Sequence, residues 1–287
     1  MSGLGSTRRG VLAGATGGGL ALSAASLSRA ADHVGVDPAN PAHALKAIMM
    51  MRGALDEQLV ISCITCSYHG VVNARMTPFY NLVAATFARY RRAPGGEYDG
   101  VSFEIEYFID PATGGVLDHW KNPYTGEVVQ AHHTDSKPIK FRIGLDSQLQ
   151  FAPAPLYKGA VISHRTLPLQ IIGNDVWSTE VTTASVPTEG GRPILFNETT
   201  TNHANLSEFS APGRMRVKTD ARYIGVSSFR PWQNMGDQTG EMIGYGEGCV
   251  GIALSELPAD WRSITKTRHP EALIDPGAYL EPLWKTL

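Results

Sequence analysis

The stretch Val101-Ser102-Phe103-Glu104-Ile105-Glu106-Tyr107-Phe108-Ile109 alternates between apolar and polar side chains over most of its length. A period of two is typical of a β-strand, because successive strand residues point to opposite faces of a sheet. Turn-forming residues follow directly, since positions 110–115 read Asp-Pro-Ala-Thr-Gly-Gly. The stretch therefore predicts a strand that ends in a turn.

Segments of the same kind recur along the chain, each bounded by Gly, Pro, Asn or Asp. Their connections are too short to hold a helix at every crossover, which favours an antiparallel sheet over a parallel one. Residues 59–64 are predicted as a strand, and residues 78–90 are ambiguous between strand and helix. The other predicted strands lie at 138–145, 159–166, 175–186, 194–201, 215–228 and 240–250.

A short helix is expected at Pro41–Met51, which is rich in Ala, Leu and Met, follows Asp37-Pro38 and precedes Gly53. Because a long sheet must protect its edges, it closes into a barrel or splits into a sandwich. We predict a mainly β fold: an antiparallel barrel, calycin-like or a similar closed sheet, with a short N-terminal helix and a short C-terminal helical segment. Thr and Ser at alternating strand positions indicate a partly polar interior that could hold a ligand.

The first thirty residues resemble a twin-arginine export signal. Arg8 and Arg9 precede an uncharged segment of Ala, Gly, Leu and Ser, and small residues suit cleavage after Ala30 or Ala31. The uncharged run is shorter than the roughly 20 residues that span a bilayer. We therefore expect a signal peptide at 1–30, the twin-arginine export machinery as a partner, a single β-barrel-like domain at 31–287, and a periplasmic or secreted location without a membrane anchor after cleavage.

Charge excludes one class of partner. The chain has 25 Lys and Arg against 27 Asp and Glu, a net charge of −2. The signal peptide holds three Arg and no acid, so the mature chain carries 22 basic and 27 acidic residues, a net charge of −5. The basic surface that neutralises phosphates in nucleic-acid-binding proteins is absent. We expect no nucleic-acid partner.

Two blocks of the sequence carry specific motifs. The first, at 104–127, contains Trp120-Lys121-Asn122-Pro123-Tyr124-Thr125-Gly126-Glu127, whose W-x-N-P-x-T-G-E pattern is its most specific part. The second, at 230–236, reads Arg-Pro-Trp-Gln-Asn-Met-Gly. Both blocks resemble those of the DUF1838 family of bacterial exported proteins, and the likeness covers most of residues 50–262 and departs at Cys63-Ile64-Thr65-Cys66 and at Gln233. It implies one compact domain and no particular reaction.

The first of these blocks is also the densest cluster of acid-base and aromatic side chains. Asp118 could orient His119 as a general base, Tyr124 could donate a proton, and Arg230 could bind a carboxylate or a phenolate. The turn at 110–115 could bring His119 back beside Glu106 in a hairpin. The alternative is a buried turn with aromatic packing. We predict His119, Tyr124 and Glu106 as catalytic residues, and Trp120, Asn122, Arg230 and Trp232 as substrate-binding residues, lining one pocket.

Glu104 and Glu106 share one face of the predicted strand, with Cα atoms about 6.6 Å apart. Paired carboxyl groups can act as acid and base, because their proximity raises the pKa of one of them. Such a pair would suit a polysaccharide-active enzyme as well as other acid-base chemistry. The same pattern also fits a strand face that is open to solvent.

Other chemistries find little support in the sequence. The His residues lack metal-ligand spacing, so no metal and no cofactor is expected; a bound metal would make His119, His132 and His164 candidate ligands. Cys63 and Cys66 in a strand would lie about 10 Å apart, too far for a disulfide, and are predicted unpaired. The glycines at 244, 246 and 248 fit a bulge or close packing better than a dinucleotide site.

These observations leave two classes of function open. The first is a cofactor-independent lyase or isomerase that acts by acid-base chemistry on a hydrophobic, aromatic or polycyclic small molecule. The second is a non-enzymatic periplasmic barrel that binds or carries such a molecule. The two differ in whether the pocket holds a perturbed acid-base group, and a buried His119 or Glu106 with a hydrogen-bond partner would favour the enzyme.

Overall fold

The predicted strand at 101–109 forms most of β3 (Tyr98–Ile109) in a computed structural model of the chain. The structure describes residues 36–135, 137–151, 159–188 and 191–287. The signal peptide expected at 1–30 lies outside the described residues. The compact unit described below spans Val34–Leu287.

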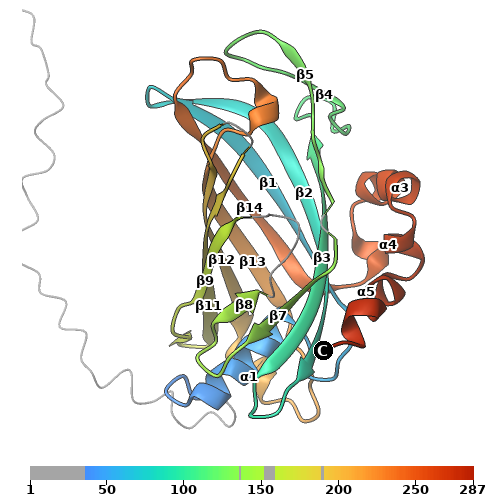
Figure 1. Cartoon of the computed structure of the whole chain (residues 1–287). Coiled ribbons are helices and arrows are strands. Elements are labelled where there is room, and N and C mark those ends of the chain that lie inside the picture. The colour runs from blue at the N-terminus through green and yellow to red at the C-terminus, as the bar shows by residue number, and fades with distance from the viewer. Residues whose placement is uncertain (1–35, 136, 152–158, 189–190) are drawn as a thin grey trace, which may run out of the picture. The chain divides into compact units, whose positions relative to one another are not determined.

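Most of the described chain is β-strand (Figure 1). The helices are α1 (Pro41–Arg52), α2 (Leu206–Phe209), α3 (Ala259–Arg268), α4 (Glu271–Ile274) and α5 (Pro276–Trp284), with 3-10 turns η4 (Pro231–Gln233) and η5 (Leu254–Glu256). The other strands are β1 (Val60–Val72), β2 (Arg75–Arg92), β4 (His119–Lys121), β5 (Val128–Gln130), β6 (Thr134–Asp135), β7 (Ile139–Ile143), β8 (Leu149–Phe151), β9 (Val161–Thr166), β10 (Gln170–Ile172), β11 (Asp175–Val186), β12 (Ile194–Asn205), β13 (Thr219–Ser228) and β14 (Gly240–Ile252).

The long strands form one antiparallel sheet in the order β10-β11-β12-β13-β14-β1-β2-β3-β7-β8. β6 also pairs with β3, and β9 also pairs with β11. The sheet curls until it is nearly closed into a barrel, as Figure 1 shows. The predicted mainly β, antiparallel, barrel-like fold is confirmed, as are the short N-terminal helix and the C-terminal helices.

Side chains close the remaining gap between β8 and β9. The amide Nε2 of Gln148, just before β8, donates to the carbonyl oxygen of Thr166 at the end of β9 (3.2 Å). The rings of Phe151 on β8 and His164 on β9 meet edge to face, with centroids 6.3 Å apart. The edges of the sheet are thus bridged without a continuous ladder of backbone hydrogen bonds.

The two faces of β3 have different surroundings. Val101, Phe103, Ile105 and Tyr107 are buried under the C-terminal helices, in a core that includes Trp261 of α3. The indole of Trp261 donates to the carbonyl oxygen of Ile105 (3.2 Å). The apolar face of the strand therefore lies outside the barrel, beneath α3–α5. The opposite face, which carries the two glutamates, points into the barrel.

Helix α1 lies at one end of the barrel (Figure 1). Asn40 caps its first turn by accepting from the backbone amides of Ala42 and His43, so the helix begins at Pro41, as expected. At the other end of the helix, Arg52 forms an ion pair with Glu180 of β11 and donates to the hydroxyl of Tyr90 on β2 (3.2 Å). These contacts tie the helix to the strands.

Two sequence predictions need refinement. The ambiguous residues 78–90 belong to the long strand β2, where Ala85 and Phe87 pack under the C-terminal helices. The strand predicted at 215–228 begins only at Thr219.

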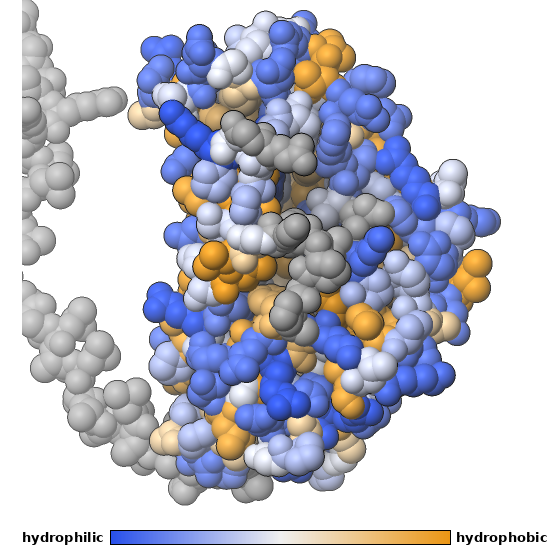
Figure 2. Space-filling model, viewed as in Figure 1, coloured by the Kyte–Doolittle hydropathy of each residue, from blue (hydrophilic) through white to orange (hydrophobic). Residues whose placement is uncertain are grey.

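Within the described part of the chain, no helix has the length and apolar character needed to cross a membrane. On the face drawn in Figure 2, hydrophobic residues form separate small groups among hydrophilic ones.

Candidate functional site

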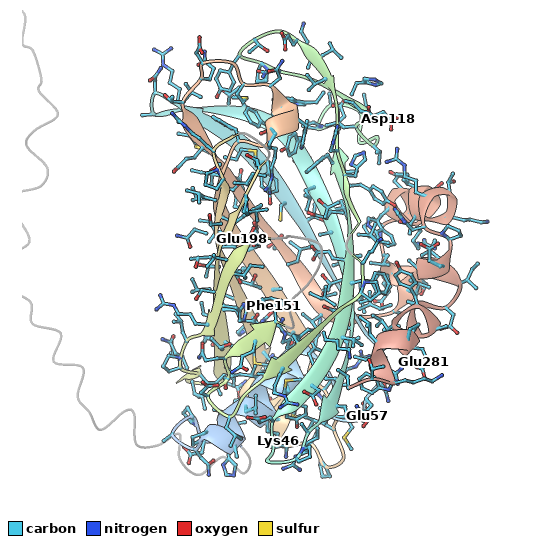
Figure 3. All side chains as sticks on the ribbon, viewed as in Figure 1. Lys46, Glu57, Asp118, Phe151, Glu198 and Glu281 are labelled. Carbon is cyan, nitrogen blue, oxygen red and sulfur yellow. The ribbon has the colours of Figure 1, made fainter. Side chains whose placement is uncertain are left out.

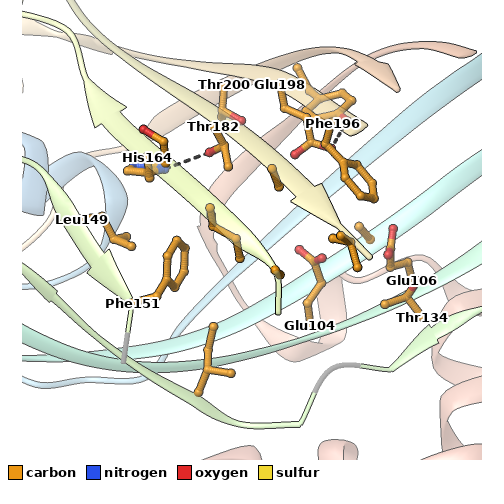
Figure 4. A pocket seen from close by; sticks show the side chains of 18 of the residues that line it. Glu104, Glu106, Thr134, Leu149, Phe151, His164, Thr182, Phe196, Glu198 and Thr200 are labelled. Atoms are coloured by element: carbon orange, nitrogen blue, oxygen red, sulfur yellow. Dashed lines mark hydrogen bonds between the residues drawn. The ribbon is translucent and has the colours of Figure 1, made fainter. Parts of the chain in front are cut away.

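A cavity of about 1330 Å³ lies inside the barrel. Its walls come from β1, β2, β3, β6, β7, β8, β9, β11, β12 and β13, so side chains far apart in the sequence share one space. Much of the lining is apolar, and Figure 4 shows polar groups gathered at separate places on it. The apolar lining includes Ile64, Leu82, Leu149, Phe151, Ile162 and Phe196.

Glu104 and Glu106 stand side by side on the cavity face of β3 (Figure 4). The hydroxyl of Thr86 donates to Glu104 Oε2 (2.7 Å), and Thr134 of β6 hydrogen-bonds to Glu106. Burial raises the pKa of Glu104, and burial together with the neighbouring Glu104 raises the pKa of Glu106 to about 8. Glu106 is therefore mostly protonated at neutral pH, and its carboxyl group can exchange a proton at a pH close to neutral.

A chain of hydroxyl groups occupies the wall next to these acids. The hydroxyls of Tyr68 on β1 and Tyr223 on β13 are 3.2 Å apart, and the Tyr223 hydroxyl donates to Glu198 Oε1 on β12 (3.0 Å). Burial raises the pKa of both tyrosines. The negative charge of Glu106 raises the pKa of Tyr68 further, and the neighbouring Tyr68 raises the pKa of Tyr223 further. Burial also raises the pKa of Glu198. Both tyrosines stay protonated at neutral pH.

Arg230 is a positively charged residue that acts on both Glu106 and Glu198. Its guanidinium lies 4.1 Å from the ring centroid of Phe196. Its positive charge opposes the rise in pKa of Glu106 and Glu198. Arg230 lines the cavity, so an anionic group of a ligand could reach its guanidinium.

A second polar group lies elsewhere on the wall, around His164 (Figure 4). His164 Nδ1 is 2.9 Å from the hydroxyl of Thr182, and His164 Nε2 is 3.5 Å from Glu180 Oε2. Glu180 is also the partner of Arg52 from α1. Burial lowers the pKa of His164, and Arg52 lowers it further while Glu180 opposes the change. The imidazole is neutral at neutral pH and is held by the ion pair behind it.

The expected pocket around His119 does not form. The hairpin after β3 extends only to the bridge between Ile109 and Val116 and the bond from Leu117 to Phe108. The chain then leaves β3, and β4 pairs with β5 in a separate sheet. His119 is exposed, and Asp118 binds Arg268 of α3 (2.7 Å) rather than orienting an imidazole. Figure 3 shows Asp118 far from Glu198 inside the barrel.

Three other predicted site residues belong to an aromatic cluster. Trp120 is buried and packs against Phe79 (4.9 Å between centroids) and Trp232 (5.8 Å). Tyr124 also meets Phe79 edge to face (5.9 Å). The cluster includes Phe108, which follows Glu106 on the same face of β3, so it packs beyond the acids along that strand. Of the seven predicted residues, the cavity brings together only Glu106 and Arg230.

Asn122 is structural rather than ligand-facing. It is fully buried, and its amide Nδ2 donates to the carbonyl oxygens of Gln233 (2.8 Å) and Asn234 (3.1 Å). Its Oδ1 accepts from the backbone amides of Tyr124 (2.8 Å) and Thr125 (3.1 Å). One side chain therefore joins the turn between β4 and β5 to η4.

Replacing Asn122 by Ala is expected to lower the free energy of unfolding by about 2–4 kcal/mol, because buried backbone groups lose their partners. Urea denaturation of the purified chain measures this change. Asn174→Ala removes an exposed amide with one long contact, to Asn205 (3.4 Å), and is expected to change stability by less than about 0.5 kcal/mol. Equal effects of the two substitutions would contradict the structural role of Asn122.

The cysteines are unpaired, as predicted. Cys63, Cys66 and Cys249 are all free thiols. Cys63 packs in the core under the C-terminal helices, whereas Cys66 lines the cavity, so the two point to opposite faces of β1. Among the residues that the structure describes, no three His, Cys, Asp or Glu side chains are grouped as metal ligands.

The residues predicted from the sequence did not include Tyr68, Tyr223 or Glu198. One signal was present, because glycines alternate at 244, 246 and 248 on β14, between the two tyrosine-bearing strands. A Cβ atom at Gly244 would lie 2.6 Å from the ring of Tyr68. Cβ atoms at Gly246 and Gly248 would meet the backbone of β1 instead, 2.1 Å from the carbonyl oxygen of Thr65 and 2.0 Å from that of Cys63. The glycines therefore serve close packing, one of the two interpretations considered for this run.

Comparison with protein families agrees with the resemblance of the two sequence blocks. The sequence model of the family described as "Protein of unknown function (DUF1838)" matches residues 58–282. The chain belongs to this family. The match runs from just before β1 into α5, so the DUF1838 region contains the sheet, the cavity and the helices α3 and α4. No curated protein matches the sequence.

Proposed function

We propose that this DUF1838 protein is a cofactor-independent lyase or isomerase that acts on a hydrophobic small molecule inside the barrel. The observation that carries the proposal is Glu106, a hydrogen-bonded carboxyl group in an apolar cavity with its pKa raised to about 8 by burial and by Glu104. A general acid or base works best when its pKa is near the working pH. Purely apolar binding would not need such a group.

The cavity supports the assignment of a small apolar substrate. Ligand pockets are concave and mostly apolar, with a few polar groups that fix orientation. Here the apolar walls surround Glu104, Glu106 and Arg230. In this proposal Glu106 moves the proton, Thr134 positions its carboxyl group, and Arg230 holds an anionic part of the substrate.

The test is conversion of small molecules by the purified mature chain. The protein is incubated with an organic extract of the producing cells, and the compounds are followed by liquid chromatography and mass spectrometry. An isomerase changes the retention of a compound without changing its mass, and a lyase splits one compound into two. Compounds that are bound and released unchanged, with none converted, would instead make the protein a carrier.

We also propose that the mature chain works in the periplasm or outside the cell, on the basis of the Arg8-Arg9 pattern. Replacing both arginines by lysine in the full chain is expected to leave uncleaved precursor in the cytoplasm, because the export machinery reads the arginine pair. Cell fractionation and immunoblotting measure the precursor. Unchanged export of the double variant would contradict this location.

A further inference from the structure

The pair of tyrosines in the cavity is built into the sheet. Tyr68 lies on β1 and Tyr223 on β13, and the strand between them, β14, has Gly246 opposite both Cys66 and Tyr223. Without a side chain on this part of β14, the two phenol rings can reach across it and bring their hydroxyls to 3.2 Å. The glycines therefore make room for a contact between strands that are not neighbours.

Neighbouring glycines also fit the rings closely. A Cβ atom at Gly244 would lie 2.6 Å from the Tyr68 ring, and one at Gly225 would lie 2.4 Å from the Tyr223 hydroxyl oxygen. Side chains at these positions would displace the tyrosines. The positions of both hydroxyls are therefore set by the backbone of the barrel, which is the preorganisation that a charge-stabilising site needs.

Glu198 completes the chain of hydrogen bonds. It lies 3.0 Å from the Tyr223 hydroxyl and lines the same cavity. In the structure the Tyr223 hydroxyl donates to Glu198. Burial raises the pKa of Glu198, and when this carboxylate takes up a proton the bond reverses: Glu198 donates to Tyr223, Tyr223 donates to Tyr68, and the Tyr68 hydrogen is left for a ligand oxygen. This part of the cavity wall, formed by β1, β12 and β13, thus offers a hydroxyl donor that is supported by two further groups.

We propose that the Tyr68 hydroxyl, supported by Tyr223 and Glu198, binds an oxygen that gains negative charge, and that the substrate is an apolar carbonyl compound that reacts through an enolate. This inference rests on the proposed function and names its substrate class. Tyr68 is then a catalytic residue, whereas Tyr223 and Glu198 are positioning residues. Neutral hydroxyl and carboxyl donors in an apolar site are a known means of stabilising an enolate.

In this reaction Glu106 removes a proton and Tyr68 stabilises the charge that results. The carboxylate of Glu106 takes a proton from the carbon next to the carbonyl group, so a C–H bond breaks and an O–H bond forms on Glu106. The C–H electron pair forms a C=C bond, and the π electrons of the carbonyl group move to its oxygen, which accepts from Tyr68. In a β,γ-unsaturated carbonyl compound the enolate is conjugated with the second C=C bond, so the oxygen electrons re-form the C=O bond, the double bond moves to the α,β position, and the γ carbon takes the proton back from Glu106, which completes an isomerisation. With a leaving group on the β carbon, the oxygen electrons re-form the C=O bond, a C=C bond forms between the α and β carbons, and the group leaves with its electron pair and takes the Glu106 proton, which completes an elimination.

The test uses 2-naphthol, an apolar probe whose ionised oxygen resembles that of an enolate, and 2-methylnaphthalene, which has a similar shape and no hydroxyl. Fluorescence titration of the purified chain is expected to show tighter binding of 2-naphthol. Tyr68→Phe should weaken 2-naphthol binding about tenfold or more and leave 2-methylnaphthalene unchanged. Tyr245→Phe is the matched control, because Tyr245 is exposed on the outer face of β14.

A separate measurement, the ionised fraction of bound 2-naphthol, tests the positioning residues Tyr223 and Glu198. Ultraviolet absorption of the bound probe distinguishes naphthol from naphtholate. Tyr223→Phe and Glu198→Leu, which remove the hydrogen-bonding groups at these two positions, are expected to lower the ionised fraction without abolishing binding. A purely structural role would not change that fraction.

Three results would overturn the inference: no preference for 2-naphthol, equal weakening of both probes by Tyr68→Phe, or no weakening of either. Glu106→Gln is expected to keep the preference for 2-naphthol, because the probe needs no base. Failure of the tyrosine site is therefore distinguishable from failure of the proposed function, which depends on the titration and activity of Glu106.

Discussion

Replacing Glu106 by Gln is expected to lower the rate of the catalysed reaction by about 10²- to 10⁴-fold, the usual loss when a general acid or base is removed. Gln keeps the size of the side chain and can still accept a hydrogen bond from Thr134, but it cannot take up or release a proton. The measurement is the turnover of whichever compound the mature chain converts. The binding of that compound should change much less than its rate of conversion.

Glu247→Gln is the matched control for this substitution. Glu247 lies on β14 and is exposed on the outer face of the barrel, opposite Thr65 of β1. The same chemical change there is expected to leave turnover within about twofold. Equal turnover by the Glu106→Gln variant and the wild type would contradict the role of Glu106.

The same substitution is expected to stabilise the fold at alkaline pH, because the cavity keeps the pKa of Glu106 at about 8 against an ordinary value of 4.5. Folding then favours the protonated form. The stability that this group contributes is fully present below its ordinary pKa and is lost as the pH rises through 8. As the pH rises from 4.5 to 8, the free energy of unfolding of the wild type should therefore fall relative to that of the Glu106→Gln variant.

The expected size of this difference is about 1–4 kcal/mol at pH 8–9, since one pKa unit corresponds to about 1.4 kcal/mol. Urea unfolding of the two proteins at a series of pH values measures it, and taking the difference between them removes the contributions of other titrating groups. The Glu247→Gln control should follow the wild type at every pH. A difference that is constant between pH 5 and 9 would contradict the raised pKa.

The strand pattern at 101–109 was sufficient to predict β3 and to place Glu104 and Glu106 on one face. It could not decide whether that face meets solvent or a cavity, because a polar strand face has the same alternation in both environments. The decision comes from α3–α5, which cover the apolar face from outside and leave the glutamates inside. Those helices lie more than 140 residues further along the chain, as the 156-residue separation of the Trp261–Ile105 contact shows.

The predicted placement of His119 beside Glu106 is wrong for a different reason. It assumed that a tight turn continues β3 into a paired strand, whereas local pairing ends after Leu117 and β4 pairs with β5. The tyrosine pair could not be predicted either, because Tyr68 and Tyr223 are 155 residues apart and meet across a third strand. Alternating glycines in a strand indicate close packing, but they do not name the side chains that use the space.

The central claim is that Glu106 carries an exchangeable proton near neutral pH inside the barrel. The most direct measurement is the side-chain carboxyl resonance of Glu106 in a chain labelled with ¹³C-glutamate, followed by NMR from pH 3 to 10 and identified by its absence from the Glu106→Gln variant. The structure predicts a titration midpoint near 8. A midpoint near 4.5, the ordinary value for glutamate, would contradict the acid-base role of Glu106 and the enzyme proposed from it.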